Sequence, residues 1–142
     1  MRFPWTPIAP AQSAPLLRVG FRRHGKIMST DPLLLVDTGA DGVLLNLALA
    51  KLMGFHDSDL VTEECKGANG LMTVHTPKNL AGTEIEIGGK WYPLPSLKFG
   101  KSVPISLLGR DLIFAHFDLR MTAGEFELQP RRSKRRARPR RR

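Results

Sequence analysis

An apolar run that ends on an acidic residue is the feature that most constrains this chain. Leu33–Val36 leads directly into Asp37-Thr38-Gly39, and a second apolar run covers residues 43–45. A continuous apolar run without alternation predicts a strand that is covered on both faces. Asp37 is therefore expected at the end of a buried strand. Because a buried carboxylate costs free energy unless it has partners, an acid at such a place is a candidate functional residue.

The residues after Asp37 suit a tight loop beside a ligand. Thr38 can hydrogen-bond the backbone and hold a turn, and Gly39 leaves room where another group must approach closely. Asp-Thr-Gly alone recurs by chance and can be a simple turn between two strands. Here it is followed by Ala40-Asp41, and a second segment, residues 105–112, reads Ile-Ser-Leu-Leu-Gly-Arg-Asp-Leu. The combination favours a functional Asp37.

Residues 36–41 resemble the active-site segment of retropepsin-like aspartic proteases, the single-domain retroviral type and its prokaryotic relatives. With residues 105–112, the resemblance covers about 15–130. It implies a mainly β fold, the closed β-barrel of the acid proteases, with a flap hairpin and one or two short helices. It also implies an aspartic endopeptidase that is a homodimer and needs no cofactor. A chain of 142 residues suits one domain, and its single Asp-Thr-Gly suits half a site per chain.

The resemblance assigns a role to each residue of these two segments. Asp37 would be catalytic, one from each subunit, in a loop supported by Thr38 and Gly39. Asp41 would lie beside the peptide substrate and form an ion pair with Arg110, unless both are solvated surface charges. A ψ-shaped support would consist of Leu107, Leu108 and Gly109, with the glycine letting two backbones pass closely. Substrate contacts are expected from Gly39, Ala40, Asp41 and the flap turn Gly67, Ala68, Asn69 and Gly70.

Local patterns predict the remaining elements. Strands are expected at 16–22, 61–66, 71–75, 83–87, 90–94, 118–121 and 126–129. The hairpin formed by 61–66 and 71–75 resembles the flap because of its place in chain order. One helix should cover 47–53, with Asn46 as its N-cap, Gly54 at its end, and Leu45, Leu49 and Leu52 on a shared face. A second short helix is expected at 112–117.

The two ends of the chain differ from its body. Residues 1–14 are rich in proline and predict an extended arm, in which Phe3 and Trp5 could contact a partner subunit or lie on their own subunit. Of 22 Lys and Arg residues, nine lie in 131–142, which leaves 13 against 13 Asp and Glu in 1–130. We expect this tail to be disordered and to bind nucleic acid or another polyanion. Its basic residues are Arg131, Arg132, Lys134, Arg135, Arg136, Arg138, Arg140, Arg141 and Arg142.

Composition limits the other possibilities. The single cysteine, Cys65, allows no intrachain disulfide, and the four histidines show no metal-ligand spacing. The sequence shows neither a signal peptide nor a membrane span, so a cytoplasmic protein is expected. Two functions stay open at this point. The first is a homodimeric aspartic endopeptidase acting on peptides or proteins. The second is a nucleic-acid-associated protein in which the tail binds polyanions and the body only dimerises.

Overall fold

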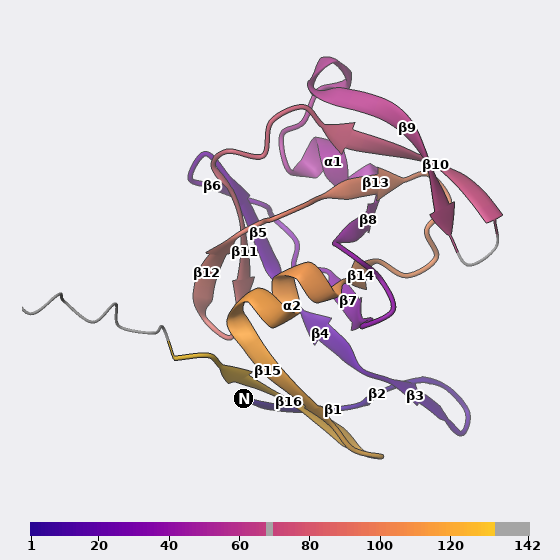
Figure 1. The fold of residues 1–142 in the computed structure, drawn as a ribbon, viewed down its shortest axis with the longest axis vertical. Coiled ribbons are helices and arrows are strands. Elements are labelled where there is room, and N and C mark those ends of the chain that lie inside the picture. The colour runs from indigo at the N-terminus through magenta and orange to yellow at the C-terminus, as the bar shows by residue number, and fades with distance from the viewer. Residues whose placement is uncertain (68–69, 133–142) are drawn as a thin grey trace, which may run out of the picture.

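The chain is mainly β-structure, as the resemblance implies, and two short helices interrupt it (Figure 1). The structure is a computed structural model that describes residues 1–67 and 70–132. The helices are α1 (Ala48–Leu52) and α2 (Arg110–His116), with a 3-10 turn, η1 (Asp57–Asp59). The strands are β1 (Arg2–Pro4), β2 (Thr6–Ala9), β3 (Gln12–Ala14), β4 (Leu16–Arg18), β5 (Gly20–Arg23), β6 (Lys26–Ile27), β7 (Leu33–Val36), β8 (Leu44–Asn46), β9 (Leu60–Gly67), β10 (Gly70–Pro77), β11 (Thr83–Ile87), β12 (Lys90–Pro93), β13 (Lys98–Gly100), β14 (Leu107–Leu108), β15 (Phe117–Met121) and β16 (Glu125–Pro130).

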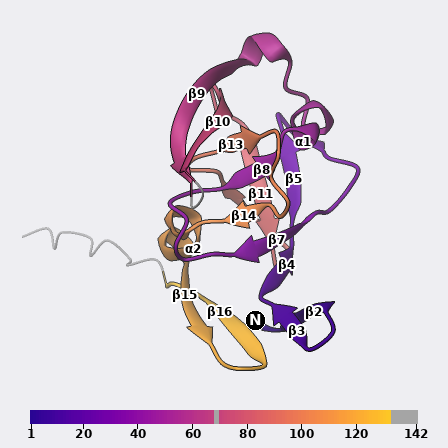
Figure 2. The ribbon, with the colours of Figure 1, turned by 90° about the vertical axis from the view of Figure 1, so that its right-hand side faces the viewer.

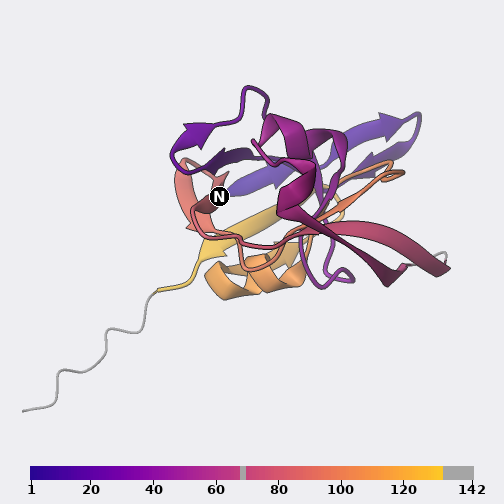
Figure 3. The same cartoon turned by 90° about the horizontal axis from the view of Figure 1, so that it is seen from above.

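A seven-stranded sheet forms the centre of the fold and leads into the Asp37 loop. Its strand order is β4-β7-β14-β8-β13-β10-β9. The outer strands β4 and β9 do not pair with each other, so this sheet is open within the described residues. The expectation of a closed barrel is corrected accordingly. The physical reason lies in β9: among the described residues it pairs with β10 alone, and this hairpin projects from the body instead of returning to β4 (Figure 3).

Three smaller sheets complete the architecture, with strand orders β12-β11-β5-β6, β1-β16-β15 and β2-β3. The hairpins β15–β16 and β2–β3 lie at one end of the molecule, and the β9–β10 hairpin lies toward the other (Figures 1 and 2). One apolar core joins the central sheet to the four-stranded sheet. Its fully buried members include Phe21, Leu34, Leu45, Ile85 and Phe99. The buried run that precedes Asp37 is therefore anchored in this core.

The first helix and the first long strand differ in detail from the sequence expectation. The segment expected as one strand, 16–22, breaks at Val19, whose N–H donates to the carbonyl of Pro32 at 3.1 Å. The break lets β4 pair with β7 while β5 pairs with β11. The side chain of Ala50 in α1 is buried, as is that of Met53 just after the helix, whereas Leu52 is 50% exposed. Leu45 is buried and Leu49 packs against the core, so the departure from the predicted face concerns Leu52.

The N-terminal arm lies on its own subunit. β1 pairs antiparallel with β16, and the rings of Phe3 and Phe126 stack with their centroids 5.1 Å apart. The N–H of Trp5 donates to the carbonyl of Gly124 at 3.1 Å. The arm thus contributes β1 to the three-stranded sheet that it forms with β15 and β16. Across residues 1–67 and 70–132, no helix has the length and apolar character needed to cross a membrane.

Candidate active site

Asp37 begins a tight loop at the end of β7. Its N–H donates to the carbonyl of Leu108 at 3.1 Å, which ties the loop to β14. Its Oδ1 accepts the N–H of Gly39 at 2.9 Å, and its carbonyl accepts the N–H of Ala40 at 3.2 Å. The carboxylate is half-buried, while Thr38 and Gly39 are exposed. The loop therefore presents one oriented acid at the surface of the subunit.

Gly39 also keeps space beside this carboxylate. A Cβ at Gly39 would lie 3.1 Å from Asp37 Oδ1, closer than a side chain normally approaches. Thr38 is at the exposed side of the loop, so its supporting role stays a prediction.

β14 lies between the two strands that enter and leave the loop. Leu107 and Leu108 pair in parallel with Leu35 and Val36 of β7, and Leu107 also pairs with Leu44 of β8. The predicted ψ-loop residues Leu107, Leu108 and Gly109 thus occupy one short segment between the two flanks of the Asp37 loop. Because β14 hydrogen-bonds to both, the backbone on each side of the loop is held in place.

The start of α2 packs directly on the same loop. The N–H groups of Arg110 and Asp111 donate to the carbonyls of Ala40 and Asp41 at 2.9 and 3.0 Å. A Cβ on Gly109 would lie 2.5 Å from the backbone nitrogen and 2.6 Å from the carbonyl carbon of Gly42. Only glycine fits this approach, as the sequence analysis expected.

Arg110 forms an ion pair with Asp41 through Nη2 and Oδ1. The two side chains are 53% and 89% exposed in the single subunit. Water screens an ion pair of this kind, so it contributes little to the stability of one subunit. The loop is held mainly by the backbone hydrogen bonds and the β14 pairing.

The structure also shows a supporting residue that the sequence analysis missed. Ser96 donates from Oγ to Asp111 Oδ2 at 2.5 Å, and Asp111 Oδ1 accepts the N–H of Leu112 at 2.6 Å. A Cβ on Gly42 would collide with Ser96 Oγ and lie 3.2 Å from Asp111 Oδ2. Ser96 lies in the loop between β12 and β13, and no sequence motif around it indicates a supporting role. Its position is determined by tertiary contact.

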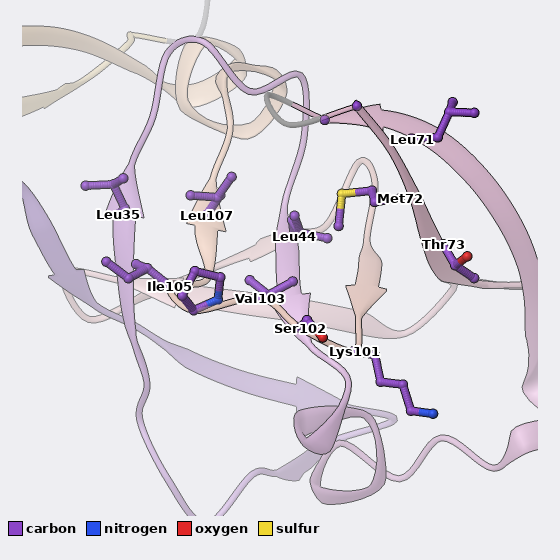
Figure 4. A pocket seen from close by; sticks show the side chains of 13 residues that line it. Leu35, Leu44, Leu71, Met72, Thr73, Lys101, Ser102, Val103, Ile105 and Leu107 are labelled. Atoms are coloured by element: carbon purple, nitrogen blue, oxygen red, sulfur yellow. The ribbon is translucent and has the colours of Figure 1, made fainter.

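The β9–β10 hairpin covers an apolar pocket of about 610 Å³ next to the loop (Figure 4). Gly67 and Gly70 of the predicted flap turn line this pocket, whereas Ala68 and Asn69 lie outside the described residues. Leu35 lines it as well, two positions before Asp37 and so on the same side of β7. Figure 4 shows the side chains of its apolar lining gathered together, with Lys101 extending away from them: Leu35, Leu44, Met72, Val103, Ile105 and Leu107.

The remaining predicted residues lie away from the loop. Arg131 pairs with Asp118 at 2.9 Å, and its N–H donates to the carbonyl of His116 at 2.8 Å. Arg132 is exposed. The other basic residues of the tail lie outside the described residues: Lys134, Arg135, Arg136, Arg138, Arg140, Arg141 and Arg142. Within the described part of the chain, no group of three or more His, Cys, Asp or Glu side chains could hold a metal ion.

Comparison with known proteins agrees with this geometry. The aspartyl protease family matches residues 25–112, which include the Asp37 loop, the β9–β10 hairpin and β14. Among solved structures, the chain is similar to a retropepsin-like aspartic protease from Rickettsia conorii, with 20% identity and a TM-score of 0.62. The match covers 89% of this chain and 97% of that one. No match was found among curated proteins. The structural likeness establishes the retropepsin-like fold.

Proposed function

Because this chain belongs to the aspartyl protease family, we propose that it is an aspartic endopeptidase that works as a homodimer. The observation that carries the proposal is the position of β14 between β7 and β8, which holds the Asp37 loop from both sides. Each chain supplies one such loop. A two-fold axis beside Asp37 would bring the two carboxyl groups together from two identical subunits.

The proposed chemistry needs both carboxyl groups. Like-charge repulsion between two close carboxyls leaves one proton shared between them. The ionised member takes a proton from a water molecule, which attacks the scissile carbonyl. The protonated member donates a hydrogen bond to the carbonyl oxygen as negative charge develops there, and a proton then passes to the leaving nitrogen. The Gly39–Asp37 hydrogen bond orients each carboxylate before substrate arrives.

An extended peptide is the substrate that suits the surroundings of Asp37. The apolar pocket beneath the β9–β10 hairpin would hold side chains of the peptide, since its lining offers mostly apolar surface. Gly39 and Ala40 would contact the peptide backbone, and the exposed Asp41 would lie beside it. The hairpin would close over the bound peptide and exclude water from the reacting groups.

Replacement of the proposed catalytic acid tests this function. Asp37→Asn keeps the side-chain volume but removes both the shared proton and the base, so cleavage of a random peptide library should fall by several orders of magnitude. A matched control is Asp57→Asn, which changes the charge equally at an exposed acid of η1. The control should cleave as the wild type does. Substantial cleavage by a purified, dimeric Asp37→Asn variant would show that Asp37 is not the catalytic residue.

A further inference from the structure

A second pocket, of about 660 Å³, lies where the β5–β6 turn meets the end of α1. Its charged and titratable lining consists of Arg23, His24, Lys26, Lys51, His56 and one acid, Asp57. The pocket shares no residue with the apolar pocket beneath the β9–β10 hairpin. The net charge of residues 1–130 is zero, so this concentration of basic side chains is a local feature of the surface.

Arg23 is held rigidly at the wall of this pocket. Its Nη1 donates to the carbonyl of Gly54 at 2.6 Å, and its guanidinium lies 4.2 Å from the centre of the Phe55 ring. Its Nη2 is 4.0 Å from Asp59 Oδ2, a long contact. Its Nε is buried and has no hydrogen-bond partner within the described chain. Because Nε is buried, a ligand in the pocket cannot reach it, and Nη1 and Nη2 are the Arg23 atoms available to donate to one.

Two lysines add positive charge that the fold does not neutralise. Lys26 lies at the start of β6 and Lys51 in the last turn of α1, and both side chains are exposed. Among residues 1–67 and 70–132, neither has a carboxylate within 4.0 Å. Both ammonium groups are therefore free to bind an anion beside Arg23. Asp57 opposes this binding, because it is the one carboxylate in the lining.

The turn between β5 and β6 places a further polar side chain at this pocket. His24 has a φ of 51°, in the left-handed region that non-glycine residues seldom adopt. Asn, Asp or Gly is the usual residue at this position of a two-residue hairpin turn. The N–H of His24 donates to the carbonyl of Gly82 at 2.8 Å, and a Cβ on Gly82 would lie 2.5 Å from His24 Nδ1. The exposed imidazole thus lies against Gly82 at the edge of the pocket, in a backbone conformation for which histidine is one of the more common non-glycine residues.

We propose that this pocket binds the phosphate group of a small molecule. A phosphate carries a charge of about −1.5 to −2 near neutral pH, which matches the net charge of +2 on the lining, where Arg23, Lys26 and Lys51 stand against Asp57 with the histidines neutral. The planar guanidinium of Arg23 can donate to phosphate oxygens, and arginine is well suited to that geometry. A single carboxylate would balance only half of this charge. Because the pocket shares no residue with the Asp37 loop, the proposal does not depend on the protease function.

The test follows backbone amides of the full-length, ¹⁵N-labelled protein while inorganic phosphate, and separately pyrophosphate, is added at constant ionic strength. Saturable shifts are expected at Gly25, Gly54 and His56. Lys26→Gln with Lys51→Gln should weaken binding by roughly tenfold or more, because two charged contacts are lost. The control, Lys66→Gln with Arg120→Gln, removes the same charge at exposed positions outside the pocket and should bind as the wild type does.

Two further variants sharpen the result. Asp57→Asn removes the only acid of the lining and should tighten phosphate binding by several-fold, a gain that damage to the fold would not produce. Arg23→Lys keeps the charge but removes the planar fork, and it should weaken binding. Absence of saturable shifts at the pocket amides would overturn the proposal. Equal weakening in the pocket pair and the control pair would also overturn it, because it would show binding by net charge alone. Thermal melting of each variant verifies that it is folded.

Discussion

Gly109 lies so close to the backbone of Gly42 that it cannot carry a side chain. A Cβ on Gly109 would meet the backbone of Gly42, and a Cβ on Gly42 would meet Ser96 and Asp111. This contact brings the start of α2 against the Asp37 loop, where two backbone N–H groups bind the carbonyls of Ala40 and Asp41. The helix is therefore a support for the loop, and the two glycines make that support possible.

Gly109→Ala should destabilise the protein. The added methyl group meets backbone atoms that cannot rotate away, so the free energy of unfolding should fall by about 1–3 kcal/mol or more. Urea unfolding measures this change. The matched control is Gly124→Ala, because a Cβ at Gly124 has no atom within 4 Å and its φ is not positive. That variant should be neutral or slightly more stable. Equal stability of the two variants would contradict the close contact seen at Gly109.

Arg110→Ala should have a small effect on the stability of the isolated subunit. The Arg110 and Asp41 side chains are 53% and 89% exposed, and an exposed ion pair contributes at most about 1 kcal/mol. The comparison variant is Arg131→Ala, which breaks the similarly exposed pair with Asp118 (49% and 67%). A loss of more than about 3 kcal/mol, seen only for Arg110→Ala and only in a dimeric sample, would mean that assembly buries the pair.

Specific activity should fall when the protein is diluted. The proposed site takes one Asp37 from each subunit, so the active fraction follows the dimer dissociation constant. Sedimentation and peptide cleavage measured over the same concentration series should give the same midpoint. A monomer with full specific activity at assay concentration would rule out a site shared between subunits.

The sequence predicts those parts of the site that depend on neighbouring residues. Leu33–Val36 and Asp37-Thr38-Gly39 are local signals, and β7 and its loop lie where these signals place them. The role of Gly109 could also be predicted, because a glycine between large apolar residues and Arg-Asp matches the ψ-shaped support of the family that the chain resembles. Ser96 gives no such signal, since its partner Asp111 is 15 positions away and the two meet only after folding.

The fold shows the same division between local and tertiary effects. The hairpins β9–β10, β11–β12 and β15–β16 lie where strand pairs were predicted, and of these 83–87 shows polar and apolar alternation before the Gly88-Gly89 turn. The burial of Ala50 in place of Leu52 depends on how α1 leaves β8, and helical spacing does not specify it. The open edge of the central sheet depends on where the β9–β10 hairpin points, which no local pattern determines. That β14 pairs with both β7 and β8 could be expected only from the resemblance to retropepsin-like proteases.

Stability should decrease as the pH is lowered through the range in which histidine titrates. Burial, and secondarily the charge of Lys90, lowers the pKa of His116. The centre of its ring lies 4.6 Å from the centre of the Tyr92 ring. The unfolded chain therefore binds a proton at a higher pH than the folded chain does. The contribution of neutral His116 to the free energy of unfolding is complete above the pKa that this histidine has in the unfolded chain. It is lost as the pH falls toward the lower pKa of His116 in the folded protein. On acidification the melting temperature of the wild type should fall relative to that of His116→Phe, which lacks the titrating group. A constant difference across the range would contradict this.

The pH dependence of cleavage tests the shared proton itself. Two coupled carboxyls give a bell-shaped profile with two apparent pKa values that belong to the pair, and repulsion places the optimum on the acid side of neutrality. Acid unfolding could imitate the lower limb, because a hydrogen bond from Arg22 lowers the pKa of Glu84, and one from the His56 backbone lowers that of Asp59. Both groups lose their stabilising contribution as they are protonated. The lower limb must therefore be measured where melting shows a folded dimer and where activity returns on neutralisation. Activity that rises with pH to a plateau, with no decline on the alkaline side, would indicate a single base and would contradict the Asp37 pair.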